Sequence, residues 1–461
     1  MILVRTWNSP GWTSLAATSA RALAFFVPVP VLSANFGQDT IAFWFLLITL
    51  QSLTALAIGN LPTILMHMIT HAKVASEESH LKAVIASTHR IFGVAAILYL
   101  ALALVLFTPL LWRQLNVVSD FWGAVGAWLV FIAGTMARIY ALSPTTFLLG
   151  LNKVAVVRRT ETISWLAGGI LSALGLLIYP NLIFAMALLQ APAIVNFLVM
   201  RRLATQHDWI YSKKLKNANQ GLIQKEIIPR AVRGSIGIVV AYLMVYGGSI
   251  IFAQFGDSAS IASFSFTVAI FGLISQLSVS HTLASLPAIS RAYAAGETTR
   301  MNAIAARASL LGIILYATLL AAAFTVYWLA DHAFPNSFPA IGLTLFLLFS
   351  IAYIPVRYAS FHLHFYSTTN DIRWHTYQIG TAVIYFMAVA LLGADKPESY
   401  AIALLIANAV YAVPYSRRLT FTRLGFGFRP EAVTLLLTLS CMALLALPLL
   451  STCGSVEVTP Q

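Results

Sequence analysis

Charged residues are scarce in this sequence: they make up 9% of its 461 residues, whereas soluble domains carry about 25%. Hydrophobic residues make up 59% and fall into blocks of roughly 17–28 residues. Blocks of this length can cross a hydrocarbon layer of roughly 30 Å as helices. The composition therefore excludes a soluble globular domain and predicts an all-α, polytopic membrane protein.

Cysteine and the usual enzyme motifs are also nearly absent. The two cysteines, Cys441 and Cys453, have no metal-binding spacing and no clear disulfide pattern. The sequence has no GxSxG, P-loop, HExxH or CxxC motif and no dinucleotide-binding GxGxxG after a strand. We therefore expect no enzyme activity, no cofactor and no metal site.

The net charge of +13 would favour nucleic acid in a soluble protein, but here the basic residues follow the membrane topology. Of the 28 Lys and Arg, 23 lie in alternate loops that we assign to the cytoplasm, and the opposite loops hold only Arg113 and Lys396. This asymmetry predicts a cytoplasmic N-terminus and no nucleic-acid partner. We expect thirteen helices, at residues 13–35, 40–66, 91–111, 120–148, 161–179, 181–200, 229–253, 259–289, 305–329, 338–366, 374–393, 398–416 and 431–451.

The sequence also carries traces of an internal duplication. Residues 187–205 and 403–421 match at eight of nineteen positions with an offset of 216, and Arg138 precedes Arg357 by 219. We interpret the chain as two parallel six-helix lobes with one additional C-terminal transmembrane helix. The predicted parts are an N-terminal lobe at 1–202, a basic cytoplasmic linker at 203–228, a C-terminal lobe at 229–419, and the extra helix and tail at 420–461.

Three arginines lie inside predicted helices, where a charge is costly and normally faces protein or water. They are Arg21, Arg138 and Arg357, and they either line a cavity that attracts an anion or lock helices together by hydrogen bonds. No Asp or Glu lies deep in a predicted helix, and Glu161 lies near a cytoplasmic end. Arginines without carboxylates favour phosphate or acidic sugar over an organic cation as the ligand.

The predicted tenth helix adds aromatic and imidazole groups. Tyr358 and His362 are candidate sugar-binding residues beside Arg357, although packing in the bundle would explain them equally. His67 and His71 are interpreted as isolated structural or interfacial residues. Seven tryptophans near helix ends predict an aromatic belt at the membrane surface: Trp12, Trp44, Trp112, Trp122, Trp165, Trp328 and Trp374.

Two segments resemble a known family. The element NFGQDTIAFWF at 35–45 and the stretch LLGLNKVAVVRRTETI at 148–163, within a six-plus-six arrangement, are similar to the polysaccharide-exporter branch of the multidrug/oligosaccharidyl-lipid/polysaccharide exporter superfamily. This branch includes the Wzx-type O-antigen flippases. The resemblance implies alternating access of two lobes, which would move an undecaprenyl-diphosphate-linked oligosaccharide from the cytoplasmic to the periplasmic leaflet of a bacterial inner membrane.

By position, the resemblance implies that Arg21, Arg138 and Arg357 line the lumen. It also implies roles in O-antigen and lipopolysaccharide synthesis, with a polysaccharide polymerase and chain-length proteins as partners. Four alternatives remain open: a multidrug cation antiporter of the same superfamily, a lipid II flippase, a membrane-bound polymerase or ligase, and a scaffold in an assembly complex. An antiporter would need a buried carboxylate, a lipid II flippase would have fourteen helices, and a polymerase or ligase would have a long outer loop.

Overall fold

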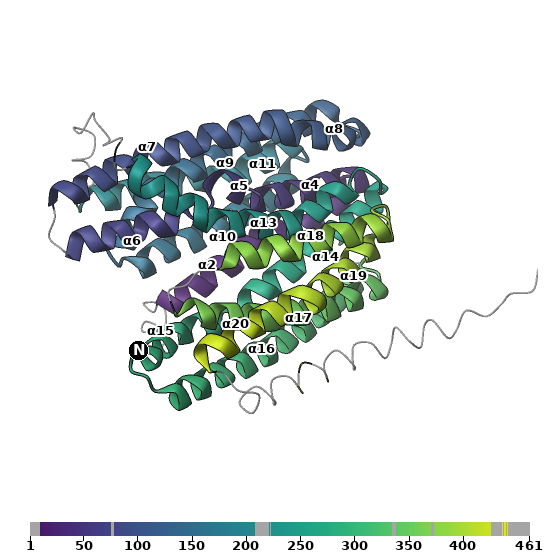
Figure 1. The fold of residues 1–461 in the computed structure, drawn as a ribbon. Helices are drawn as coiled ribbons and strands as arrows, with labels where there is room; N and C mark the ends of the chain where they lie inside the picture. Colours follow the sequence, from purple (N-terminus) through teal and green to yellow (C-terminus); the bar gives the residue numbers. More distant parts are fainter. Residues whose placement is uncertain are drawn as a thin grey trace, which may run out of the picture. The chain divides into compact units, whose positions relative to one another are not determined.

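The computed structural model describes residues 10–74, 78–207, 221, 223–333, 338–369, 373–425, 436, 438 and 440. Helices form all of the regular structure in these residues, and no strand occurs among them (Figure 1). Twelve helices of the described part are long and apolar enough to cross a membrane. The protein is therefore an all-α, multi-pass membrane protein, as the composition predicts. The predicted thirteenth helix at 431–451 lies almost wholly outside the described residues.

Six of these twelve spans precede residue 206. The elements of this part of the chain, in which η denotes a π-helical segment and of which α6 belongs to no span, are α2 (Pro10–Phe26), α3 (Val29–Asn35), α4 (Gln38–Ser52), α5 (Ala55–Ile58), α6 (Leu61–Val74), α7 (Glu78–Leu102), η1 (Ala103–Phe107), α8 (Thr108–Val117), α9 (Phe121–Gly150), α10 (Val154–Ile178) and α11 (Leu182–Thr205). The other six spans follow residue 234. The elements of this second part, of which η3 and α15 belong to no span, are η3 (Ile223–Ile227), α13 (Ile228–Phe252), α14 (Ser258–Ser278), α15 (Ser280–Ala294), α16 (Thr298–Ala333), α17 (Leu343–Ser367), α18 (Trp374–Leu392), α19 (Pro397–Ala407), η4 (Asn408–Ala412) and α20 (Val413–Leu424).

The predicted second helix is not continuous. We expected one helix at 40–66, but the chain forms α4, α5 and α6 with breaks after Ser52 and Ile58. Gly59 has a φ of +49°, a left-handed conformation that interrupts a right-handed helix and favours glycine. Pro62 suits the first turn of α6, which begins at Leu61, because the backbone N–H groups of a first turn have no partner within the helix. The Asn60 backbone N–H instead donates to Ser235 Oγ of α13 at 2.9 Å.

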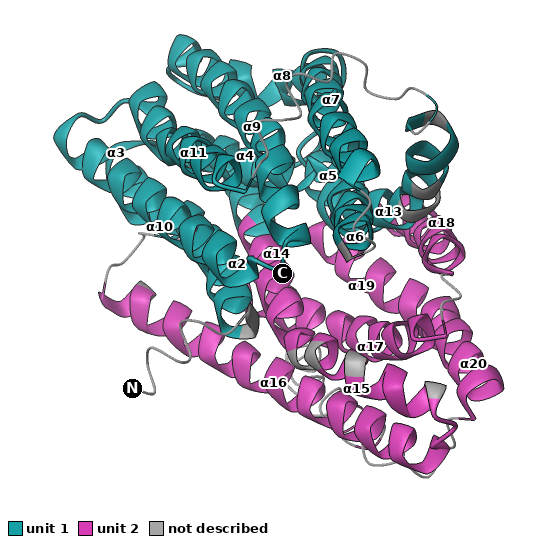
Figure 2. Cartoon of the chain, turned by 90° about the vertical axis from the view of Figure 1, so that its left-hand side faces the viewer, with its two compact units in different colours: residues 1–265, 336–338 teal, residues 266–335, 339–461 magenta. Residues whose placement is uncertain are grey.

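The chain divides into two compact units, drawn in teal and magenta in Figure 2. Unit 1 comprises residues 1–265 and 336–338, and unit 2 comprises 266–335 and 339–461. Helix α13 thus groups with unit 1, although the sequence repeat assigns it to the second half. Grouping by contact does not test descent from a duplicated sequence, so the predicted lobes at 1–202 and 229–419 stay a prediction.

Within unit 1, α2 and α10 run parallel and pack closely. Trp165 lies by Arg21 and Gly169 lies against Ala24, so the two helices keep a sequence offset of 144–145 over this contact. A Cβ atom on Gly169 would come within 2.7 Å of Ala24 Cα, and one on Gly168 within 2.7 Å of the Leu189 carbonyl oxygen on α11. This glycine pair therefore lets α10 pack between α2 and α11 at backbone distance.

Candidate functional site

Two of the predicted arginines converge on one tryptophan in unit 1. The Arg138 guanidinium carbon of α9 lies 3.6 Å from the Trp165 ring centroid, and that of Arg21 on α2 lies 5.9 Å from it. Both distances fall within the range of a cation–π contact, which is about 6 Å. Arg21 is exposed and Arg138 is partly buried. The arrangement presents two cations around a single indole ring.

Helix α11 holds Arg138 in place. Its Nε donates to Gln190 Oε1 at 3.0 Å, and its Nη2 donates to the Leu189 carbonyl at 3.4 Å. Gly134 makes room for this contact, because a Cβ there would come within 2.6 Å of the Gln190 side chain. The Nη1 group has no hydrogen-bond partner in the described part of the chain. Arg138 is therefore oriented by protein while one donor group stays available to a ligand.

Trp165 itself is only 9% exposed, so its predicted place in an interfacial belt is wrong. Its ring lies 5.8 Å from Phe25, whose carbonyl accepts a hydrogen bond from Trp44 Nε1 at 3.1 Å. Trp44 is also fully buried. The prediction fails because a residue near a helix end can still face a neighbouring helix. The exposed tryptophans that fit the belt are Trp12, Trp112, Trp122 and Trp328.

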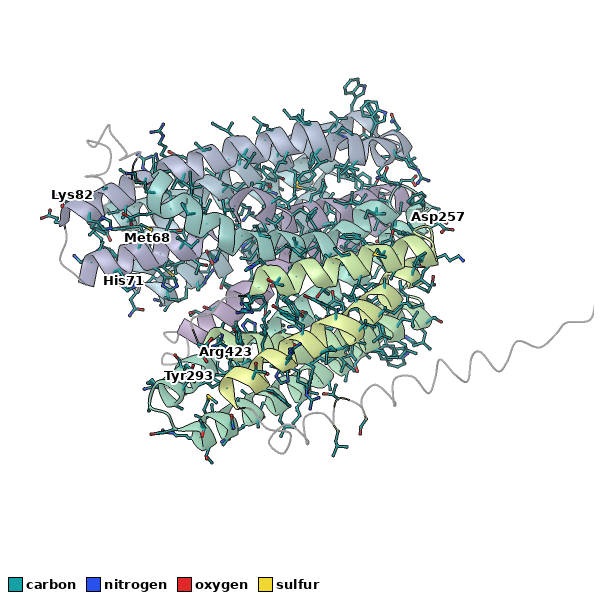
Figure 3. The ribbon with its side chains drawn as sticks, in the orientation of Figure 1. Met68, His71, Lys82, Asp257, Tyr293 and Arg423 are labelled. Carbon is teal, nitrogen blue, oxygen red and sulfur yellow. The ribbon has the colours of Figure 1, made fainter. Side chains whose placement is uncertain are left out.

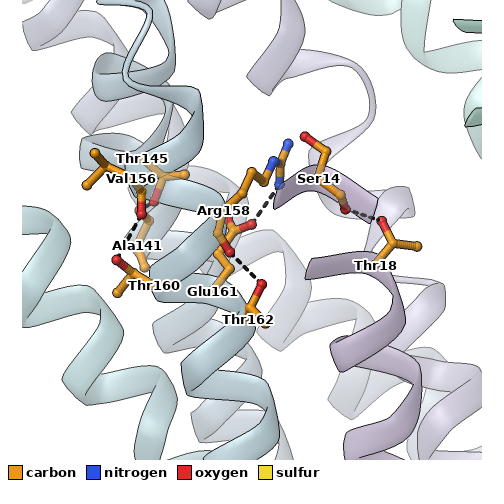
Figure 4. A network of polar contacts seen from close by, with 9 residues as sticks. All are labelled: Ser14, Thr18, Ala141, Thr145, Val156, Arg158, Thr160, Glu161 and Thr162. Carbon is orange, nitrogen blue, oxygen red and sulfur yellow. Dashed lines mark hydrogen bonds and ion pairs between the residues drawn. The ribbon is translucent and has the colours of Figure 1, made fainter. Parts of the chain in front are cut away.

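One turn from Trp165, α10 carries an ion pair. Arg158 Nη1 lies 2.7 Å from Glu161 Oε2, and Figure 4 shows this pair together with Ser14 and Thr18 of α2. Glu161 is close enough for its charge to act on Arg138. Arg21, Arg138 and Arg158 together with Glu161 give the cluster a formal charge of +2, from three cations and one anion. An anion is therefore the favoured ligand of this cluster.

Arg357 has different surroundings in unit 2. It lies on α17, is only 9% exposed, and donates through Nη1 to the Ser275 carbonyl of α14 at 2.8 Å. Its buried Nε has no hydrogen-bond partner in the described residues. The phenol groups close enough to act on its charge are those of Tyr316, Tyr353 and Tyr377. In this conformation Arg357 is enclosed by protein, so the surroundings of Arg138 and Arg357 do not correspond.

The other two predicted site residues lie on the same helix as Arg357. The Tyr358 and His362 rings are 4.8 Å apart, and each residue is 3% exposed. His362 Nδ1 is hydrogen-bonded to Thr420 Oγ1 of α20 at 2.7 Å. This hydrogen bond joins α17 to α20. The structure thus groups Arg21 with Arg138 in unit 1, and Arg357 with Tyr358 and His362 in unit 2.

Two histidines that we interpreted as isolated share a pocket of about 370 Å³ in unit 1. His67 and His71 lie one turn apart on α6, which also carries the Met68 labelled in Figure 3. The pocket is lined by Ile64, His67, Met68, His71, His80 and Glu226. No group of three or more His, Cys, Asp or Glu in the described residues is arranged to hold a metal ion. The pocket therefore brings His67, His71, His80 and Glu226 together with two apolar side chains of α6.

The sequence did not identify Trp165 and Gln190 as partners of Arg138, and it did not predict the ion pair of Glu161 with Arg158. A signal was present in α10, where Arg158, Glu161 and Trp165 recur at three- and four-residue spacing and hence share one helix face. Gln190 carries no such pattern. Its role depends on the packing of α9 against α11, which the sequence does not reveal.

The sequence matches no family model and no curated protein. Solved structures do share the fold. The lipid II flippase MurJ in an inward closed conformation aligns with a TM-score of 0.68 at 14% identity, over 97% of this chain and 93% of that one. An inward-facing multidrug resistance MATE family transporter of the MOP superfamily aligns at 0.66 and 12% identity, over 87% and 94%.

A MATE transporter of Vibrio cholerae aligns at 0.59 and 14% identity, over 92% of this chain and 99% of that one. At such low identity the shared property is the fold. The chain therefore has the fold of the MATE and MurJ transporters of the MOP superfamily.

Proposed function

We propose that this protein is an alternating-access flippase for an undecaprenyl-diphosphate-linked oligosaccharide of O-antigen or related polysaccharide synthesis. It would move its substrate from the cytoplasmic to the periplasmic leaflet of a bacterial inner membrane. The shared fold supports a transporter, since the neighbours of known structure move molecules across membranes. The short connections at 118–120, 179–181, 253–257 and 393–396 support a transporter over a polymerase or ligase, which would need a larger outer loop.

The cluster around Trp165 is the observation that supports an anionic substrate. A guanidinium can bind two phosphate oxygens at once, and Arg21 and Arg138 flank one ring with a net positive charge around them. Arg21 lies eleven residues from the start of α2, about 16 Å along the helix, so the charge lies far inside the membrane span. Such a charge is costly without a function. The Trp165 ring is 9% exposed and lies against the Arg138 guanidinium, so it positions this cation for an anionic group.

A multidrug cation antiporter is the second candidate, and Glu161 favours it. This carboxylate lies inside α10, next to the arginine cluster, where a coupling residue for cations would be expected. Its ion pair with Arg158, however, compensates its charge. We therefore place the antiporter second to the flippase.

Deletion of the gene in its native bacterium tests the proposal. Loss of surface polysaccharide, with the lipid-linked intermediate trapped on the cytoplasmic face, supports a flippase. Complementation with Arg138→Ala should fail, whereas Arg202→Ala, an exposed arginine at the end of α11, should restore the glycan. The Glu161→Gln variant distinguishes the candidates, because a flippase should keep most of its activity.

Two results would count against the flippase. One is normal surface glycan in the deletion strain when no redundant flippase is present. The other is increased sensitivity to cationic drugs that Glu161→Gln reproduces and Arg138→Ala does not. The second result would favour the antiporter.

A further inference from the structure

A second cavity in unit 1 is almost entirely apolar. It has a volume of about 340 Å³ and lies among α5, α7, η3 and α13. Among its lining residues only Arg90 and Ser235 have polar side chains, and Ser235 is hydrogen-bonded to the Asn60 N–H. It shares no residue with the arginine cluster around Trp165. We call this cavity the α7–α13 groove.

The walls of the groove are apolar faces of two helices. On α7 the lining residues Arg90, Val94 and Leu98 are spaced four residues apart, so they form one line along the helix. On α13, Ile228 and Val232 do the same. Val94 is 59% exposed, Leu98 46% and Val232 53%. Because α7 crosses the membrane, this exposed rim faces hydrocarbon, and a hydrocarbon chain rather than water is the matching occupant.

A single cation marks one end of the groove. Arg90 is exposed and makes no ion pair within the described part of the chain. It precedes Val94 and Leu98 along α7, and η3, which supplies Ile223 and Ile227, precedes α13. The charge and the beginnings of both walls thus lie toward the helix starts that the basic loops assign to the cytoplasm. An arginine at the membrane surface attracts anionic lipid.

We propose that the α7–α13 groove binds an anionic phospholipid of the bilayer, with an acyl chain along α7 and α13 and the phosphate on Arg90. The apolar lining selects the chain, and the arginine selects a negatively charged headgroup. This site is separate from the proposed substrate site and does not depend on the proposed function. Bound lipid would pack against α13 where Ser235 joins it to the break at Gly59, and so would stabilise α13 within unit 1.

Photolabelling of the full-length protein tests the site. The purified protein is placed in phosphatidylcholine nanodiscs with a small fraction of phosphatidylglycerol that carries a diazirine in one acyl chain. Labelled peptides are then identified by mass spectrometry. We expect labelling at residues 91–98 and 227–232 to exceed labelling at Ile170 and Leu174, which are exposed on α10 and serve as internal references.

Two variants test the binding of the acyl chain and of the headgroup separately. Arg90→Gln should lower groove labelling about fivefold, the equivalent of about 1 kcal/mol. Ala231→Trp should abolish it by filling the groove. Leu171→Trp, at an exposed position of α10, is the matched control and should change nothing.

Three results would overturn the proposal. The first is equal labelling of the groove and the α10 references in the unmodified protein. The second is equal groove labelling by the same probe with a phosphatidylcholine headgroup, since this would remove the selection by charge. The third is unchanged groove labelling in Arg90→Gln and Ala231→Trp together, when both variants elute as the folded protein.

Discussion

The central carbon of the Arg138 guanidinium lies 3.6 Å from the Trp165 ring centroid, while its Nε donates to Gln190 Oε1 at 3.0 Å. The tryptophan thus covers a partly buried charge without neutralising it. A carboxylate in the same position would have satisfied the arginine and removed its attraction for an anion. This relationship therefore keeps a partly buried cation available to a ligand.

Replacement of Trp165 should weaken substrate binding in steps. Tryptophan is the best cation–π partner, followed by the other aromatic residues, and a partly desolvated contact contributes about 1–2 kcal/mol. We expect Trp165→Phe to bind lipid-linked oligosaccharide a few-fold more weakly and Trp165→Leu about tenfold more weakly. Titration of the purified protein measures both affinities. Trp122→Leu, at a 76% exposed position of α9, should bind like the unmodified protein, and a Trp165→Leu variant of unchanged affinity would exclude the site.

The close contact of α2 and α10 predicts a large effect of one methyl group. In Gly169→Ala the new Cβ would lie 2.7 Å from Ala24 Cα, a backbone atom that cannot move aside. Overpacking of this kind costs about 1–3 kcal/mol. Thermal unfolding in detergent should show a clear fall in Tm. Gly93→Ala on α7 has open space around its Cβ and should be neutral or slightly stabilising, so equal Tm values for the two variants would refute the predicted packing.

The sequence predicted most of the membrane spans because their signal is local. An apolar run long enough to cross the bilayer is readable residue by residue, and the described structure contains twelve such spans. Gly59 and Pro62 were expected to kink one continuous helix at 40–66, because glycine and proline also occur inside membrane helices, but the chain breaks at Gly59 with a φ of +49°. Arg21, Arg138 and Arg357 could be recognised from the sequence because charged residues are rare inside apolar spans.

The partners of those arginines were not predictable. Arg138 and Arg357 look equivalent at an offset of 219, yet one packs on Trp165 and Gln190 while the other donates to a carbonyl of α14. Which neighbour a residue meets depends on helix rotation and crossing. Both properties follow from long-range packing and leave no periodic trace in one helix.

Asp257 gives a test that depends on pH. Its Oδ1 accepts a hydrogen bond from the Ser260 backbone N–H at 2.7 Å at the start of α14, and this bond lowers the pKa of Asp257. A lowered pKa stabilises the fold above the unfolded-state value of about 3.9, and this contribution is lost as the pH falls through the lower native pKa. Asp257→Ala should therefore lose about 0.5–1 kcal/mol at pH 7.

The difference between Asp257→Ala and the unmodified protein should shrink as the pH falls below about 4. Asp257→Asn keeps an acceptor for Ser260 but cannot ionise, so it should retain most of the stability at pH 7 and lose the dependence on pH. Tm values of the three proteins at pH 7 and pH 3.5 provide the comparison. A constant difference between Asp257→Ala and the unmodified protein across this range would contradict the assigned role of the carboxylate.

Arg357→Met separates the two interpretations of the second arginine. Arg357 is buried, its Nε has no hydrogen-bond partner in the described residues, and its Nη1 bonds only a carbonyl. Replacing a buried charged group by an apolar side chain of similar volume is often neutral or stabilising. If Arg357 is kept for the substrate, Arg357→Met should keep or raise the Tm and abolish surface glycan in the complementation assay. If Arg357 instead locks α17 to α14, the variant should lower the Tm while the folded fraction still supports glycan.

Arg307→Met on α16 controls for the loss of one positive charge and should change neither measurement. Because the two interpretations predict opposite pairs of results, one purified variant and one complemented strain decide between them.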